Sequence, residues 1–67
     1  MSERAYTVTG MTCEHCVRSV EEEVGDVAGV RGVDVDLASG RLVVSGEEFT
    51  DAAVRAAVAE AGYSVAP

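Results

Sequence analysis

Two segments with helical periodicity, each flanked by short alternating segments, constrain the fold of this 67-residue chain more than any other feature. In residues 14–24, Val20 and Val24 recur at the spacing of one helical face, with charged residues on the opposite side. The second segment follows Thr50, a suitable N-cap, and repeats small apolar residues up to Ala61. Both segments are therefore predicted to be amphipathic helices.

The remaining apolar residues predict four strands. These strands occupy residues 4–9, 33–37, 41–45 and 63–65. A tight turn at residues 38–40 joins the second and third strands into a hairpin, which gives the order βαββαβ. With right-handed crossovers, this order predicts an α+β, ferredoxin-like sandwich, in which a four-stranded antiparallel sheet carries both helices on one face.

Composition excludes several function classes. The 12 acidic side chains outnumber the 5 basic ones, the formal charge is -7, and there is no Lys to meet a nucleic-acid backbone. No apolar run reaches the roughly 20 residues that span a bilayer, so no membrane insertion is expected. A chain this short folds as one domain over residues 1–67 and buries only about 60% of its unfolded surface, which leaves no room for a large internal active site.

The compartment follows from the chain start and the cysteines. Residues 1–6 lack the apolar stretch of a secretory signal, so we expect a cytoplasmic protein. Thiols stay reduced in the cytoplasm, and Cys13 and Cys16 are therefore expected to be reactive or metal-binding rather than a structural disulfide.

The stretch from Gly10 to Cys16 carries the chemistry. Two thiols separated by two residues converge when Cys13 lies in a loop and Cys16 on a starting helix. The helix N-terminus favours thiolates, and a thiolate pair selects soft ions such as Cu(I). Arg18, one turn further, either adds positive charge to this site or is a solvated residue of the helix surface.

Other interpretations of the cysteine pair stay open. A structural zinc ion usually takes four protein ligands, and only His15 is close in sequence, with its side chain expected to point away. A thioredoxin-like dithiol enzyme is disfavoured because the chain is short and its only proline is Pro67. A pair of surface thiols without a role is the simplest alternative.

The stretch Gly10–Cys16 resembles the Gly-Met-x-Cys-x-x-Cys signature of the heavy-metal-associated domain family, whose most similar members are bacterial cytosolic copper chaperones. Residues 61–63 also resemble the segment that precedes the last strand of that family. Mercury-binding relatives share the signature. Zinc-transporting relatives often carry an acidic residue on the N-terminal side of the first cysteine, where this chain has Met11 and Thr12, and this difference favours copper.

The resemblance implies a role for each residue of the site. Cys13 and Cys16 would bind Cu(I) in a near-linear two-coordinate site. Met11 would pack under the loop, and Tyr63 would shield the metal. His15 would tune the pKa of the dithiol, bind metal in an associated dimer, or remain exposed without a role.

The expected function is that of a non-enzymatic copper chaperone. It would hand Cu(I) by ligand exchange to the N-terminal metal-binding domain of a copper-transporting P-type ATPase, or to a copper-sensing regulator. We expect a monomer, with a copper-loaded dimer as an alternative. Three other interpretations are a small thiol-disulfide oxidoreductase, an Hg(II) or other soft-metal carrier, and an excised transporter domain. Met1 and the complete fold favour a stand-alone protein over the last of these.

Overall fold

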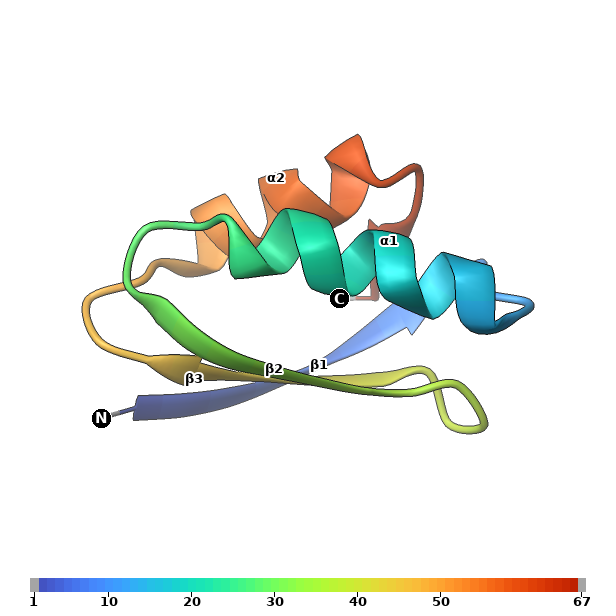
Figure 1. Ribbon diagram of the computed structural model, residues 1–67, viewed down its shortest axis with the longest axis horizontal. Helices are drawn as coiled ribbons and strands as arrows, with labels where there is room; N and C mark the ends of the chain where they lie inside the picture. Colours follow the sequence, from blue (N-terminus) through green and yellow to red (C-terminus); the bar gives the residue numbers. More distant parts are fainter. Residues whose placement is uncertain (1, 67) are drawn as a thin grey trace.

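The computed structural model describes residues 2–66, which form a four-stranded sheet covered on one face by two helices (Figure 1). The elements are β1 (Ser2–Thr9), α1 (Glu14–Gly25), β2 (Val30–Asp36), β3 (Arg41–Gly46), α2 (Asp51–Glu60) and β4 (Ser64–Val65). The strand order is β2-β3-β1-β4, and every neighbouring pair is antiparallel. The predicted ferredoxin-like sandwich is confirmed. Met1, used above in favour of a stand-alone protein, and Pro67, used against a thioredoxin-like enzyme, lie outside the described residues.

The hydrophobic core fills the space between the helices and the sheet. Small side chains dominate it, because valines supply most of the inward positions of both helices. Six side chains in this layer are fully buried: Val20, Val24, Leu42, Val44, Val54 and Val58. Among residues 2–66, no helix lies over the opposite face of the sheet (Figure 1).

Helix α2 begins as its sequence predicts. The Oγ1 atom of Thr50 accepts a hydrogen bond of 3.2 Å from the backbone N–H of Ala53, which satisfies one of the unpaired donors of the first turn. The helix ends at Glu60, one residue before the predicted end. Ala61 is its C-cap, and Gly62 follows with a positive φ of 94°, a common way to end a helix.

The hairpin differs from its prediction at both ends of β2. This strand begins at Val30, and a bulge between Val30 and Gly32 adjusts its register against β3. It ends at Asp36, so that Leu37 lies in the turn instead of the strand. The carbonyl of Asp36 accepts from the Gly40 N–H at 2.8 Å, and its carboxylate accepts from the Ala38 N–H at 3.0 Å. These two bonds start the turn one residue early.

Strand β4 is short and pairs only with the end of β1, through Val8 with Val65 and Thr9 with Ser64. Tyr63, predicted as the first residue of this strand, precedes it instead. This position sets the Tyr63 side chain beside the loop that follows β1. None of the helices within residues 2–66 is long and apolar enough to cross a membrane.

Candidate metal centre

The loop between β1 and α1 presents both cysteines at one end of the molecule. Gly10 turns the chain out of β1 with a φ of 96°. Cys13 is the N-cap of α1, and its carbonyl accepts from the N–H groups of Cys16 at 3.0 Å and Val17 at 3.3 Å. Cys13 therefore lies at the end of the loop and Cys16 in the first turn of the helix, as the spacing predicts.

The two sulfur atoms lie 3.5 Å apart. Both cysteines are free thiols, and Cys13 is exposed while Cys16 is half-buried. If one ion sat midway between collinear thiolates, with bonds of the zinc–sulfur length of about 2.3 Å, the sulfurs would be about 4.6 Å apart. The pair must therefore open by about 1 Å to hold an ion in a linear arrangement, and the exposed side chain of Cys13 is the one free to move.

The surroundings of Cys16 favour its thiolate. The pKa of Cys16 falls from the ordinary value of 9.0 to about 6. Backbone hydrogen bonding from Thr12 is the largest cause, followed by the Tyr63 hydroxyl and the backbone of Cys13. A thiolate is the form that binds soft metals, and at neutral pH Cys16 is predominantly in this form.

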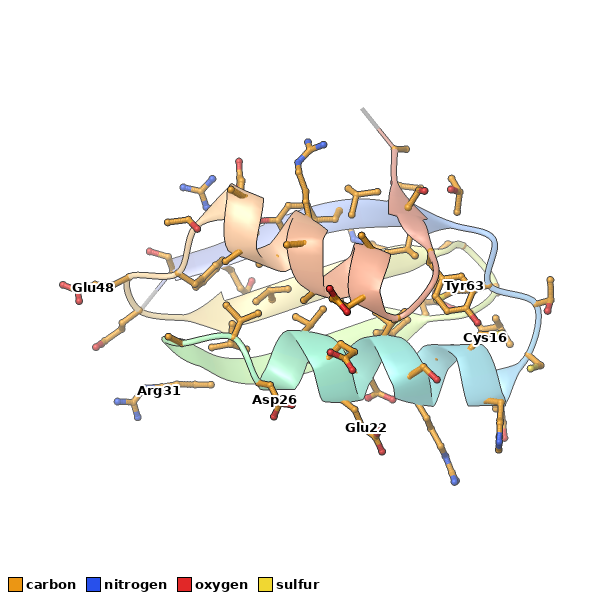
Figure 2. All side chains as sticks on the ribbon, turned by 90° about the horizontal axis from the view of Figure 1, so that it is seen from above. Cys16, Glu22, Asp26, Arg31, Glu48 and Tyr63 are labelled. Carbon is orange, nitrogen blue, oxygen red and sulfur yellow. The ribbon has the colours of Figure 1, made fainter. Side chains whose placement is uncertain are left out.

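Tyr63 approaches the site from the segment between α2 and β4. Figure 2 shows its side chain next to Cys16, with the hydroxyl end of the ring toward Cys16. The pKa of Tyr63 is raised, mainly because its hydroxyl is hydrogen-bonded to Cys16. Tyr63 therefore stays protonated and acts as a hydrogen-bond donor to the sulfur.

The other residues singled out from the sequence lie around the pair without touching the sulfurs. Met11 is half-buried and packs against the hydrophobic core. His15 and Arg18 are exposed on α1, where they line a shallow hollow together with Ser19 and Glu22. Arg18 is not among the groups that lower the Cys16 pKa. The loop backbone and the Tyr63 hydroxyl, instead of positive charge from Arg18, stabilise the thiolate of Cys16.

Thr12 is a contributor that the sequence argument missed. Its Oγ1 atom lies 3.8 Å from the Cys16 sulfur, in addition to the backbone effect described above. Thr12 stands directly before the N-cap and four residues before Cys16, and this spacing was the available signal. Within residues 2–66, no three His, Cys, Asp or Glu side chains cluster so that they could hold a metal ion. The candidate ligands are thus the two sulfurs.

Comparison with known proteins identifies the family. The heavy-metal-associated domain model matches residues 5–64, and the chain belongs to this family. The chain is 37% identical to the copper chaperone CopZ of Bacillus subtilis (strain 168), over 98% of this chain and 99% of CopZ. A solved CopZ metallochaperone superposes with a TM-score of 0.93 at 30% identity, covering 97% of this chain and 100% of that one.

Zinc transporters are also among the relatives. The chain is 43% identical to part of the zinc/cadmium/lead-transporting P-type ATPase of Shigella sonnei (strain Ss046), over 91% of this chain but 8% of the ATPase. The family therefore supports heavy-metal binding in a domain that is not an enzyme, and it includes proteins named for copper and for zinc.

Proposed function

We propose that this protein is a copper chaperone that binds Cu(I) through the sulfurs of Cys13 and Cys16. The observation that carries the proposal is the pair of accessible sulfurs 3.5 Å apart, one of them with a pKa lowered to about 6. Soft thiolates select Cu(I) over harder ions. The full-length match to a protein named as a copper chaperone supports the same cargo.

Release of the ion follows from the small ligand set. A two-sulfur site leaves Cu(I) open to attack by a third sulfur, so a partner with its own cysteine pair can form a three-coordinate bridge. The sulfurs then exchange one at a time, and no bond of the protein is made or broken apart from the metal–sulfur bonds. The exposed Cys13 is the sulfur that we expect to leave first, because half-buried Cys16 is held by Thr12 and Tyr63.

The proposed partner is the N-terminal metal-binding domain of a copper-transporting P-type ATPase, with a copper-sensing regulator as a second candidate. The net charge of -7 favours a partner whose docking surface is basic. We place this transfer in the cytoplasm, where thiols remain reduced. Residues 1–67 would act there as one heavy-metal-associated domain.

A competition titration tests the choice of cargo. Reduced protein is titrated anaerobically with Cu(I) and with Zn(II), each against a chelator of known affinity for that ion. We expect the Cu(I) complex to survive a chelator concentration that removes Zn(II), and the Cys13→Ser and Cys16→Ser variants to lose most of their Cu(I) affinity. Tighter retention of Zn(II) would assign the protein to zinc handling, in line with its ATPase relatives.

A further inference from the structure

Strand β1 has a free edge away from the metal loop. It pairs with β3 along Ser2–Thr7, but on its other side β4 pairs only with Val8 and Thr9. One more bond, from the Ala66 N–H to the Thr7 carbonyl at 2.7 Å, closes that pairing. Within residues 2–66, the outer side of residues 2–6 has no strand beside it. Figure 1 shows that this part of β1 leads away from the loop before α1.

The direction of the backbone groups along this edge follows from two hydrogen bonds. The N–H of Val8 donates to the carbonyl of Gly40, directly before β3, whereas the carbonyl of Thr7 accepts from Ala66, after β4. Backbone groups alternate between the two sides of a strand. The N–H and C=O groups of Glu3 and Ala5 therefore point out of the free edge, where an added strand would find donors and acceptors in register.

A notch of about 430 Å³ runs along the same edge, in line with β4. It is lined by Arg4, Ala5, Tyr6, Thr7, Asp51, Arg55 and Ala66. The charges of this notch differ from those of the molecule as a whole. Two arginines face one carboxylate here, although the whole chain carries a formal charge of -7.

The carboxylate of the notch is already engaged. Asp51 Oδ1 accepts from Arg4 Nη1 at 2.8 Å and from the Tyr6 hydroxyl at 2.7 Å. Arg55 is exposed and makes no hydrogen bond or salt bridge to the other residues in the range 2–66. The notch thus retains one uncompensated positive charge, which favours an acidic ligand.

We propose that the free edge of β1 at Glu3–Ala5 binds an extended acidic segment of another protein as an additional antiparallel strand. Backbone hydrogen bonds to an exposed strand supply affinity in this kind of recognition, and alternate side chains supply specificity. The segment's residue opposite Arg4 points to the side of α2, as Arg4 itself does. An acidic side chain there enters the notch and meets Arg55.

Pairing with a second copy of this chain is disfavoured by the same register. If two β1 edges paired in an antiparallel way, the outward N–H and C=O groups of Glu3 and Ala5 in one copy would have to lie opposite those of Glu3 and Ala5 in the other. Pairing Glu3 with Ala5 sets Arg4 against Arg4 of the copy, and like charges directly opposite are destabilising. Pairing Ala5 with Ala5 brings Glu3 of the copy against Thr7, whose carbonyl is already bound to Ala66.

The test is an NMR titration of the reduced, metal-free protein with a capped peptide, Thr-Glu-Thr-Val-Thr, whose first residue lies opposite Ala5, so that none of its residues lies opposite Thr7, which is already bound to Ala66. We expect the amide signals of Glu3 and Ala5 to shift and to become protected from hydrogen exchange. A peptide with Lys in place of its Glu should bind about fivefold more weakly, the order of one exposed ion pair. N-methylation of the two Thr residues that flank the Glu, whose N–H groups would donate to β1, should abolish binding.

Two charge variants of the protein supply matched controls. Arg55→Glu should remove the preference for the acidic peptide, whereas Arg31→Glu, the same change at an exposed residue outside the notch, should leave it intact. The Cys13→Ser/Cys16→Ser double variant should bind the peptide like the wild type. The strand site is thereby tested independently of the copper proposal.

Three results would overturn the assignment. The first is the absence of shifts at Glu3 and Ala5 at millimolar peptide. The second is equal binding of the acidic and basic peptides. The third is a shift of these amides with protein concentration in the absence of peptide, which would make a second copy of the chain the occupant.

Discussion

The ring of Tyr63 lies against Gly10, and this contact joins the segment before β4 to the loop that presents the sulfurs. A Cβ atom at position 10 would lie 3.3 Å from Cδ1 of Tyr63, and the backbone of Gly10 has a φ of 96°. The dihedral angle therefore favours glycine, and a Cβ atom here would in addition press on the Tyr63 ring, which would have to shift by a few tenths of an ångström. The Tyr63 hydroxyl reaches Cys16 from this position, so the packing of the ring and the chemistry of the sulfur are linked.

Replacement of Gly10 by Ala should destabilise the protein and disturb the site together. We expect the free energy of unfolding to fall by about 2 kcal/mol, because a side chain at positive φ is strained. The Tyr63 ring must also shift, which weakens its hydrogen bond to Cys16. Urea unfolding measures the first effect, and a pH titration of thiolate absorbance measures the second.

Gly25→Ala is the matched control for Gly10→Ala. Gly25 ends α1 without a positive φ, and a Cβ atom there would meet nothing within 4 Å. We expect this variant to be as stable as the wild type or more stable by about 0.5 kcal/mol, with an unchanged thiolate titration. Equal losses of stability in the two variants would contradict the role assigned to the Gly10–Tyr63 contact.

Tyr63→Phe should raise the pKa of Cys16 from about 6 toward its ordinary value of 9.0. The substitution removes the hydroxyl that donates to the thiolate but keeps the ring against Gly10. Ultraviolet absorbance of the thiolate, followed with pH in the reduced protein, measures the change. Tyr6→Phe, which removes a partly buried hydroxyl bonded to Asp51 instead, should leave the Cys16 titration in place. An unshifted titration in Tyr63→Phe would remove Tyr63 from the site.

The lowered pKa of Cys16 also predicts how stability depends on pH. Because the folded state favours the thiolate, the unfolded chain binds more protons at this site between pH 6 and pH 9. The contribution of the Cys16 thiolate to the free energy of unfolding is therefore complete above pH 9 and is lost as the pH falls through about 6. Unfolding of the metal-free wild type and of Cys16→Ser at these two pH values measures it. The stability gain from pH 6 to pH 9 should be larger in the wild type than in Cys16→Ser.

Leu42 and Val43 are neighbours on β3 that point to opposite faces of the sheet. Leu42 is fully buried beneath the helices, whereas Val43 is half-buried on the face without helices. Leu42→Ala should lower the free energy of unfolding by about 3 kcal/mol, because burial is lost and a cavity is left behind. Val43→Ala should lower it by about 1 kcal/mol or less. Urea unfolding of the two variants compares them, and similar losses would place the core elsewhere.

The fold could be predicted from hydrophobic periodicity and helix capping, because both depend on residues that are close together in the sequence. The spacing of Val20 and Val24 marks the buried face of α1, and Thr50 makes the cap that its position indicates. The boundary at Leu37 was wrong because apolar alternation continues past the end of β2. The carbonyl and the carboxylate of Asp36 both accept hydrogen bonds from residues of the hairpin turn. The alternation of apolar residues does not indicate these two bonds.

The site was predictable only in part for a related reason. Cys13 and Cys16 converge because they lie three positions apart and because α1 begins between them. Both the spacing and the start of the helix can be recognised in the sequence. The contribution of Thr12 depends on the path of the loop. The Tyr6–Asp51–Arg4 cluster joins residues 45 and 47 positions apart, and it exists only because α2 begins beside β1. Thr12 had only its four-residue spacing from Cys16 as a signal in the sequence, and the cluster had no spacing pattern that would reveal it.

X-ray absorption at the copper edge tests the central claim most directly. The protein is loaded anaerobically with Cu(I), and the atoms bound to copper are identified in the wild type and in the Cys13→Ser/Cys16→Ser double variant. The proposal predicts that only sulfur is bound to copper in the wild type and that this signal is lost in the double variant. Copper bound to nitrogen or oxygen without sulfur, or the same spectrum from both proteins, would contradict it.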